Sequence, residues 1–373
     1  MKTFYYLFIA VLLICGSAVK AQFRKYSNEF LNIGAGARGM AMGGAQAASV
    51  SDGTAGYWNP ASLVHVNEGT QLNLMHSEYF AGIGKYDYAS VAIPTTNQKR
   101  AIGVTALRFA VDDIMNTLFL VEPDGTINYN NIRPFSSADY AVLLSYAQQL
   151  SRSKDKAVNF GLNAKVIHRS VGSFAKAWGF GLDAGLQISK NRWKFGIVGK
   201  DITTTFNSWA FSFTDKEKEV LYLTQNDIPI KSTEMTSPRL VLGVGKFFPL
   251  GKSSFLLAET NFDVTFDGRR NTVISSSPIS VDPKVGLEYG YKDVFFVRGG
   301  INNFQKALAD GDTLNQKKVW IFQPSAGAGF KVGPVVVDYA YANLANQSNP
   351  LFTHVISLKA NLGWRKKEKS LTF

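Results

Sequence analysis

Apolar and polar residues alternate along most of the chain from about residue 70 onward. In residues 158–166 every second side chain is apolar, and the side chains between them belong to Asn, Gly, Asn and Lys. Because successive side chains of a β-strand point to opposite faces, this pattern predicts a strand with one apolar and one polar face. Further segments of this kind are 178–188, 256–266, 284–291 and 356–364; the alternation is less clean in 72–80, 86–93 and 102–109.

Turn signals divide this region into about fourteen strands. Their predicted starts lie near residues 70, 85, 100, 138, 157, 176, 192, 237, 252, 283, 293, 321, 335 and 353, with long connections at 111–138, 201–237 and 303–318. An even number of antiparallel strands of about 10 residues, with short turns at one end and longer loops at the other, is typical of an outer-membrane barrel. We therefore predict an all-β fold, a transmembrane antiparallel β-barrel of about 14 strands in the bacterial cell outer membrane, in contact with its lipid.

A secreted β-sandwich or β-propeller would also show alternating apolar and polar residues, because each of its sheets buries one face and exposes the other to water. The positions of the aromatic residues favour the membrane, since they fall near strand ends on the apolar face, as in an interfacial girdle. The residues concerned are Trp178, Trp193, Tyr289, Tyr291, Tyr339, Tyr341 and Trp364. Glycine recurs on the opposite face, where the wall of a barrel and its contents approach closely.

The alternation also assigns side chains to the two faces of the barrel. We expect ten apolar residues to face lipid: Val158, Phe160, Leu162, Phe180, Leu182, Leu256, Phe262, Leu287, Leu358 and Leu362. Eight charged residues of both signs are expected in the lumen: Lys165, Asp183, Glu259, Asp263, Lys284, Glu288, Arg298 and Lys359. Mixed charges are expected to pair with one another and with lumen contents, whereas a porin selective for one sign would show a biased set.

The first residues read as a secretory signal peptide. Lys2 precedes the apolar run 4–14, and small residues stand before Gln22, so residues 1–21 are expected to be removed. The only cysteine, Cys15, lies in this segment after Ile14, which suits a lipoprotein acylation site poorly. The mature chain would then lack a thiolate for redox chemistry or zinc binding. We divide the rest into an N-terminal plug or hatch, residues 22–66, and a barrel, residues 67–373.

Composition and charge add two constraints. The 373 residues are 46% hydrophobic and carry a formal charge of +12, which removal of Lys2 and Lys20 lowers by two to +10. A basic chain suits nucleic acid or an anionic membrane surface. The secretory signal argues against nucleic acid. After the signal, no run of 18 apolar residues is present, so strands rather than helices would have to cross the membrane.

A glycine- and alanine-rich segment precedes the first strand. It reads NIGAGARGMAMGGAQAASVSDGTAGYWNPASL, residues 32–63, and contains G-x-G-x-x-G at Gly34, Gly36 and Gly39. A dinucleotide site needs a strand before these glycines, a helix after them and a crossover to a parallel strand. No βαβ pattern is present, so the nucleotide interpretation is disfavoured. Asp52 does follow the glycines at a spacing in the sequence that would suit a contact with a ribose.

Packing gives a simpler explanation of the segment. Its residues have almost no side-chain bulk, so its backbone could pack closely against a barrel wall or fit into a lumen. Arg38 and Asp52 could then pair with charges that face the lumen. Asn59-Pro60 is a turn signal that leads the chain to the first strand.

The same residues carry a resemblance to a known family. A Gly/Ala-rich N-terminal segment, an aspartate, and an aromatic residue followed by N-P-A resemble the FadL-type outer-membrane proteins, and residues 30–63 are similar to the PorV/PorQ branch found in Bacteroidota. The resemblance implies a fourteen-stranded barrel with an N-terminal hatch. The plug residues that it singles out, as structural or partner-gating positions, are Gly34, Gly36, Arg38, Gly39, Gly43, Gly44, Asp52, Trp58, Asn59 and Pro60.

Two functions follow from the resemblance. The first is an accessory role in the type IX secretion system, in which the barrel partners the translocon or the surface-attachment machinery and its secreted cargo. The alternative is a FadL-type transporter, with an apolar pocket for a hydrophobic ligand in the lumen and a lateral opening in the wall.

Catalysis is not expected. The four histidines, His65, His76, His168 and His354, fall singly in different segments, and neither H-E-x-x-H nor G-x-S-x-G occurs. A Ser/His/Asp set assembled across the barrel is the remaining enzymatic alternative. We expect no cofactor, no metal site and no nucleic-acid partner.

Overall fold

The computed structural model describes residues 22–23, 26–67, 69–95, 99–229, 231–308, 317–343 and 352–363. The expected signal peptide and Trp364 lie outside these residues. The division into signal, plug and barrel remains a prediction in its exact boundaries.

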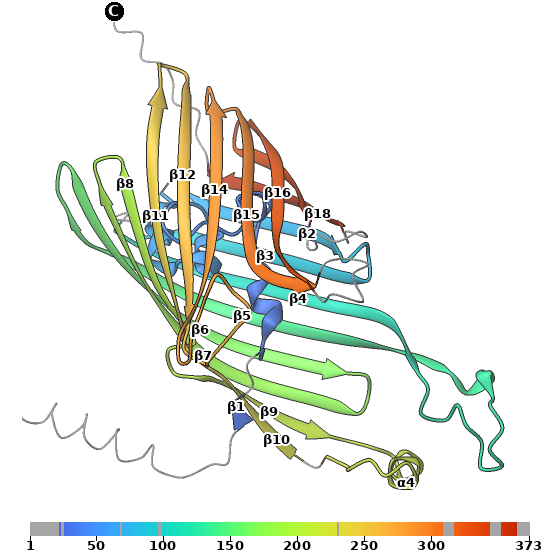
Figure 1. Ribbon diagram of the computed structural model, residues 1–373. Coiled ribbons are helices and arrows are strands. Elements are labelled where there is room, and N and C mark those ends of the chain that lie inside the picture. Colours follow the sequence, from blue (N-terminus) through green and yellow to red (C-terminus); the bar gives the residue numbers. More distant parts are fainter. Residues whose placement is uncertain are drawn as a thin grey trace, which may run out of the picture.

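The wall is a closed antiparallel barrel of 14 strands. Each strand pairs with its neighbour in the chain, and the barrel closes where the last strand pairs with the first wall strand, Ile356 opposite His76 (Figure 1). The unbroken wall strands are β2 (Thr70–Tyr79), β3 (Gly84–Pro94), β4 (Arg100–Asn116), β5 (Arg133–Arg152), β6 (Lys156–Val171), β7 (Ala175–Lys190), β12 (Ser254–Thr265), β14 (Ser280–Tyr291), β15 (Phe295–Leu308), β16 (Lys318–Val332), β17 (Val335–Asn343) and β18 (Phe352–Leu362).

Two further wall strands are each broken into two pieces. The first consists of β8 (Trp193–Lys200) and β9 (Thr205–Phe211), which both pair with β7. The second consists of β10 (Lys231–Thr236) and β11 (Arg239–Leu250), which pair with β9 and β8 respectively. Only β11 continues to β12, so the β9–β10 hairpin diverges from the barrel (Figure 1). Two short strands lie beside this wall: β1 (Gln22–Phe23) on β10 and β13 (Ile274–Ser275) on β14.

The two ends of the barrel differ in the length of their connections. Residues 191–192, 251–253, 292–294 and 333–334 make short turns at one end, whereas 117–132 and 212–230 are long loops at the other. In outer-membrane barrels the short turns are periplasmic, so the long loops are extracellular. Among the described residues, no helix has the length and apolar character needed to cross a membrane.

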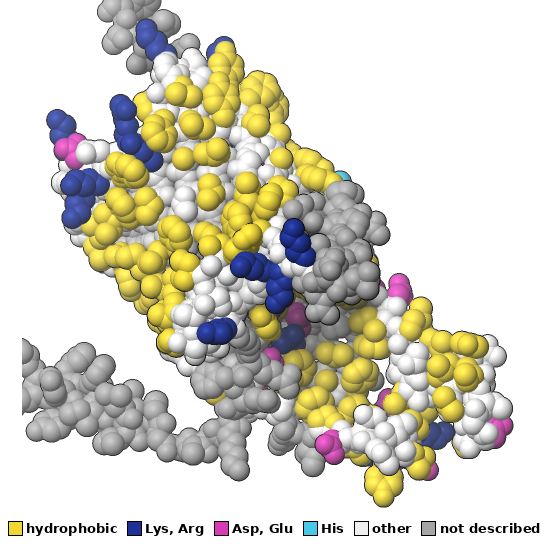
Figure 2. All heavy atoms as spheres, viewed as in Figure 1, with side chains coloured by type: hydrophobic (Ala, Val, Ile, Leu, Met, Phe, Trp, Pro, Cys, Tyr) yellow, Lys and Arg dark blue, Asp and Glu magenta, His cyan; other side chains and the backbone are white. Residues whose placement is uncertain are grey.

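Side chains alternate between the two faces of the wall as predicted. Of the ten residues expected to face lipid, none is buried, and Phe180, Leu287 and Leu362 are 47%, 48% and 54% exposed. Their chain neighbours point inward; Asn159 and Asn163, for example, are buried. The space-filling view shows the resulting apolar outer surface (Figure 2). Exposed hydrophobic side chains on a barrel wall are the surface that lipid covers.

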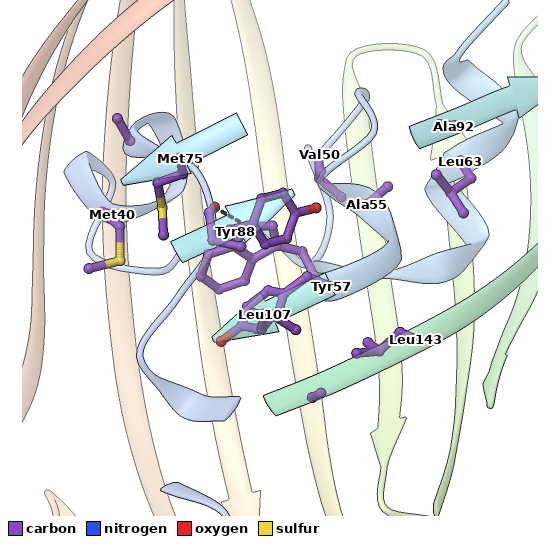
Figure 3. Close-up of a cluster of buried hydrophobic side chains, with 14 of the residues drawn as sticks. Met40, Val50, Ala55, Tyr57, Leu63, Met75, Tyr88, Ala92, Leu107 and Leu143 are labelled. Carbon is purple, nitrogen blue, oxygen red and sulfur yellow. Dashed lines mark hydrogen bonds between the residues drawn. The ribbon is translucent and has the colours of Figure 1, made fainter. Parts of the chain in front are cut away.

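Residues 26–67, which we call the plug segment, lie inside this wall. They form η1 (Glu29–Asn32), α2 (Ala37–Ala41), α3 (Ala55–Trp58) and η2 (Pro60–His65). A cluster of buried side chains joins the segment to strands β2–β6, with Tyr57 and Leu63 from the plug packed near Tyr88, Leu107 and Leu143 from the wall (Figure 3). The core of the molecule therefore lies between the plug and one side of the barrel.

The sequence prediction of the long connections needs correction in three places. Residues 201–237, expected to be a single connection, contain β9, helix α4 (Asp215–Leu223) and β10. Strand β4 extends to Asn116 and β5 begins at Arg133, so the connection predicted at 111–138 is shorter. Strand β15 reaches Leu308, within the connection predicted at 303–318.

Candidate functional site

The glycine-rich part of the plug touches the wall by its backbone. The amide of Asn302 donates to the Gly43 carbonyl over 3.0 Å, and the Ser325 hydroxyl donates to the Ala41 carbonyl over 3.0 Å. Gly43 has φ +62°, and a Cβ added there would stand 2.8 Å from the Ile301 nitrogen. The wall is equally small at these contacts, because a Cβ on Gly286 would lie 2.6 Å from the Met42 carbonyl oxygen. Close backbone contact therefore accounts for glycine on both sides.

The other glycines singled out from the sequence have similar environments. A Cβ on Gly39 would lie 2.7 Å from the Trp58 ring, and one on Gly36 would lie 3.2 Å from Thr54. Gly34 has φ +122° and donates its N–H to the Tyr57 hydroxyl over 2.9 Å. Gly44 has φ +78° and lies beside Lys284. None of these amides lies at the N-terminus of a long helix, because α2 has only 5 residues, so the arrangement differs from a dinucleotide site.

Arg38 joins the plug to the far wall through charged hydrogen bonds. Its Nε donates to Glu288 Oε2 over 2.7 Å, and its Nη1 donates to Gln46 Oε1 over 2.7 Å. Glu288 also accepts from Arg298, which in turn donates to Asp338 over 2.6 Å. Burial acts to lower the pKa of Arg38, but Glu288 outweighs it and raises the pKa, so the guanidinium stays charged.

Asp52 forms a second charged link, to the strand that closes the barrel. Its Oδ2 lies 3.6 Å from Lys359 Nζ, and its Oδ1 accepts from the N–H of Thr54 over 3.0 Å. Burial acts to raise the pKa of Asp52, but Lys359 and Arg38 outweigh it and hold the pKa below its ordinary value. Asp52 is therefore a carboxylate paired with the wall.

Trp58, Asn59 and Pro60 connect separate parts of the plug. The Trp58 Nε1 donates to the Ala35 carbonyl over 2.9 Å. Asn59 Nδ2 donates to the Ala47 carbonyl over 2.7 Å, and Asn59 Oδ1 accepts from the Ala61 N–H over 3.2 Å. Asn59 is the N-cap of η2 and Pro60 is its first residue, so the predicted turn is the start of a 3₁₀ helix.

The charged residues expected in the lumen all lie there, and each is paired. Lys165 contacts Asp183 at 2.7 Å, Lys284 contacts Asp263 at 2.8 Å, and Arg298 contacts Glu288 at 2.5 Å. Lys359 contacts Asp52, and Glu259 accepts the backbone N–H groups of Ala48 and Ser49 over 2.8 and 3.0 Å. Pairing of both signs with one another and with the plug leaves no single-sign path through the lumen.

A large cavity lies on the extracellular side of the plug; we call it the vestibule. Its volume is about 760 Å³. One side is apolar and comes from the plug and the first wall strands, with Phe30, Ile33, Met40, Trp58, Tyr79, Phe80 and Phe109. Charged residues also line it, Asp139, Arg169, Arg239, Asp263, Asp282 and Lys284, and Asp139 lies directly beside Phe109 on the neighbouring strand. Such a cavity suits a ligand that has both an apolar and a polar part.

The sequence did not indicate how the wall breaks beside this cavity. The break between β8 and β9 contains Asp201 and Thr204, which have φ +57° and +61°. The Asp201 carboxylate accepts from Lys165 and from Thr205, both over 2.5 Å. Plug residue Asn28 donates to Thr236 over 2.9 Å just before β11. These contacts are tertiary, so no local pattern in the sequence marks them.

Comparisons with known proteins agree with the barrel. Neither family models nor curated proteins match the chain. Among solved structures, it is similar to the Pseudomonas putida toluene transporter TodX, with 12% identity, a TM-score of 0.56 and coverage of 88% of this chain and 98% of that one. It is also similar to the CymD monoaromatic hydrocarbon channel, with 16% identity and a TM-score of 0.54, and to the Ralstonia pickettii toluene transporter TbuX, with 13% identity and a TM-score of 0.52. Each of these two comparisons covers 88% of this chain and 98% of the other. At this identity the likeness shows the fold, that of an outer-membrane β-barrel.

Proposed function

We propose that this outer-membrane barrel binds a hydrophobic small molecule in the vestibule and transfers it across the membrane, as a FadL-type transporter. The observation that carries the proposal is the apolar side of the vestibule. Four of its residues, Phe30, Ile33, Met40 and Trp58, belong to the plug, so a ligand held there would contact the plug directly. Ligand binding could then favour a displaced plug, if the ligand binds that state more tightly.

The likeness to TodX and TbuX supports the same class of ligand, because both are toluene transporters. The vestibule differs from a purely apolar pocket in its charged residues. Arg239 and Lys284 line the same cavity as the apolar side chains, and both are held by Asp263, at 3.8 and 2.8 Å. The vestibule would therefore also accept an amphiphile whose polar end lies toward these residues.

A FadL-type transporter also needs a lateral opening in the barrel wall. Strands β2 and β3 pair without interruption from Tyr79 opposite Gly84 to Gln71 opposite Ala92. Strands β3 and β4 do so from Gly84 opposite Val111 to Pro94 opposite Ala101. The pairing is broken instead between β8 and β9. We expect the lateral opening of a FadL-type transporter at that break rather than in the first strands.

Binding of toluene and of dodecanoate to the barrel in lipid nanodiscs, measured by calorimetry, tests the proposal. The variant Ile33→Asn/Phe109→Asn removes apolar surface that the plug and the wall each contribute to the vestibule. Each buried apolar side chain stabilises a contact by about 1.5 to 3 kcal/mol, so affinity should fall at least about tenfold. Ile83→Asn is the matched control, because Ile83 is 61% exposed in the β2–β3 turn and does not line the vestibule. Failure of both ligands to bind the wild-type barrel would reject the proposal.

An accessory role in type IX secretion is the second candidate. The resemblance of residues 30–63 to the PorV/PorQ branch supports it, as does the extracellular projection of two loops. These loops expose Val121, Ile127, Tyr129, Tyr222 and Leu223, which are 59% to 78% accessible and could contact a partner protein. The contacts of the plug with the wall account for the same motif without a secretion partner. Copurification with translocon or attachment subunits would favour this candidate.

Catalysis has no support in the arrangement of the histidines. His65 contacts Gln187, His76 contacts Asp87 and Glu78, and His354 contacts the Tyr339 hydroxyl. The remaining His168 contacts a backbone carbonyl. No serine or threonine is among these contacts, and the described residues hold no group of three or more His, Cys, Asp or Glu side chains suited to a metal. We therefore propose binding and transfer rather than a reaction.

A further inference from the structure

The outer surface of the barrel has an apolar stripe of very different height on its two sides. On β16 the outward side chains are apolar from Trp320 to Val332, and on β14 they are apolar from Val281 to Tyr291. On β3 and β4 the apolar outward run between the periplasmic end and the charged residues holds Ala89, Val91, Ile93, Ile102, Val104 and Ala106, and the exposed Met115 lies beyond those charges. At about 3.3 Å per residue and a tilt of about 40°, the stripe is about 30 Å high on β16 and about 10 Å high on β3 and β4, whereas the usual band is about 25 Å.

Charged side chains replace the apolar ones immediately above this low stripe. His76, Asp87 and Arg108 lie directly opposite one another on β2, β3 and β4. Asp87 is bound on both sides, by His76 Nδ1 at 2.7 Å and by Arg108 Nη1 at 3.1 Å. Lys85 contacts Asp112 at 3.0 Å farther toward the extracellular end. All of these side chains are more than a third exposed on the outer face.

A shallow depression lies below these charges, across β18, β2, β3, β4 and β5. Its volume is about 550 Å³. Ala89 and Ala106 are the small residues of its lining, and Leu74, Ile356 and Leu358 are the larger apolar ones. His76, Asp87, Arg108 and Tyr140 form its polar part. We call this depression together with its charged rim the β2–β5 outer groove.

We propose that the β2–β5 outer groove binds a phosphate-bearing lipid of the outer leaflet. One acyl chain lies against Ala89 and Ala106, and the phosphate accepts hydrogen bonds from Arg108. This inference is independent of the ligand proposed for the vestibule, since the two sites lie on opposite faces of the wall.

Four features favour a lipid over a protein partner. The depression is lined almost entirely by apolar side chains, as an acyl chain requires. The charges are already paired within the barrel, so no buried countercharge from a partner is needed. The exposed Arg108 guanidinium still has N–H donors for phosphate oxygens beyond the one bound to Asp87, whereas both ring nitrogens of His76 are taken by Asp87 and Glu78. The low apolar stripe also requires the headgroup layer to approach the bilayer centre on this side of the barrel, which brings phosphates to the height of Arg108.

Native mass spectrometry of the barrel released from nanodiscs tests the proposal. The nanodiscs contain phosphatidylethanolamine, phosphatidylglycerol and a minor amount of diacylglycerol, which lacks the phosphate. We expect the wild-type protein to retain a phospholipid and no diacylglycerol. Asp87→Asn/Arg108→Gln keeps the net charge and should reduce the retained fraction about tenfold. Asp293→Asn/Lys331→Gln is the matched control, because it removes an exposed pair at a periplasmic turn, 2.5 Å apart.

The acyl-chain contact is tested separately by filling the depression. Ala106→Leu should reduce retention, whereas Ala328→Leu, at an outward position of β16, should not. Equal retention by wild type and both groove variants, or retention of diacylglycerol as readily as phospholipid, would overturn the proposal. So would a groove that retains no lipid but is covered by a copurifying protein.

A spin-label measurement avoids dependence on variants of the charged pair. Nitroxides placed singly at Ala89 and at Ala326 report collision with a water-soluble nickel complex and with oxygen. The label at Ala89 should show the greater access to nickel, because the headgroup layer lies lower on its side. Equal access at the two positions would overturn the proposal.

Discussion

The glycine contacts between plug and wall predict a specific loss of stability when Gly43 becomes alanine. Gly43 has φ +62°, and a Cβ there would lie 2.8 Å from the Ile301 nitrogen, which belongs to the wall and cannot move aside cheaply. The left-handed backbone costs an L-residue roughly 1 to 2 kcal/mol, and overpacking adds about 1 to 3 kcal/mol. Gly43→Ala should therefore destabilise the plugged barrel by about 2 to 5 kcal/mol.

The control for this prediction separates the backbone cost from the contact. Gly333 has φ +57° in a periplasmic turn, and a Cβ there would meet no atom within 4 Å. Gly333→Ala should thus cost only the backbone part, about 1 to 2 kcal/mol. The difference between the two variants measures the contact between the plug and β15.

Two assays follow the change. The urea concentration at which half of the barrel is unfolded, read from heat-modifiable gel migration, reports global stability. The rate of trypsin cleavage after Arg38 reports local release of the plug, because Arg38 is held inside the lumen by Glu288. We expect faster cleavage in Gly43→Ala than in Gly333→Ala. Equal midpoints and equal cleavage rates in the two variants would refute the reasoning that wall contact requires glycine.

Four further predictions concern charge, pH, lipid and nucleotide. Arg38→Met leaves Glu288 with one partner fewer and should destabilise the plug by about 3 kcal/mol in urea titrations, with partial recovery in Arg38→Met/Glu288→Gln. Burial, with Lys194 nearby, lowers the pKa of His65 from 6.5 to about 4, so the unfolded chain binds the proton more readily. The free energy of unfolding from urea titrations should therefore fall by up to about 3 kcal/mol as the pH drops from 6.5 to about 4, and this loss should be absent in His65→Gln. Leu287→Arg should make the free energy of folding into liposomes less favourable by about 2 to 4 kcal/mol. Leu250 is equally exposed but lies at a strand end, so Leu250→Arg should make it less favourable by only about 0 to 1 kcal/mol. Equal losses in the two variants would contradict the assigned membrane position. Equilibrium dialysis with NAD should detect no binding to the native barrel, and measurable binding would revive the dinucleotide interpretation.

Much of the fold could be predicted from the sequence, because each wall strand turns one face to lipid and the other to the lumen and its residues alternate accordingly. The predicted start near residue 70 corresponds to Thr70, and that near 353 corresponds to Phe352. The predicted links from Arg38 and Asp52 to lumen charges are both formed. Opposite charges in a water-poor lumen must pair, so their types could be anticipated even though their partners could not.

The features that sequence reasoning missed depend on contacts between distant residues. The break after Lys200 follows from Asp201 binding Lys165, which lies on β6, and no spacing rule connects the two. The less regular alternation of the first strands also has a structural cause. Their outward faces carry Asp87 and Arg108 in the β2–β5 outer groove, while their inward faces carry Tyr86 and Leu107 in the core. Both faces are mixed there, so periodicity alone is a weak signal.

The central claim, that the vestibule binds a hydrophobic small molecule for transfer, is tested most directly in cells that lack the gene. The deletion strain is complemented with the wild-type gene, with Ile33→Asn/Phe109→Asn or with Ile83→Asn, and each culture is assayed for uptake of labelled toluene and dodecanoate and for the amount of secreted protein. The account predicts that deletion lowers uptake of at least one compound, that the wild type and Ile83→Asn restore it, and that the double variant does not, with secretion unchanged throughout. Loss of secreted protein with normal uptake of both compounds would contradict it and favour the secretion role.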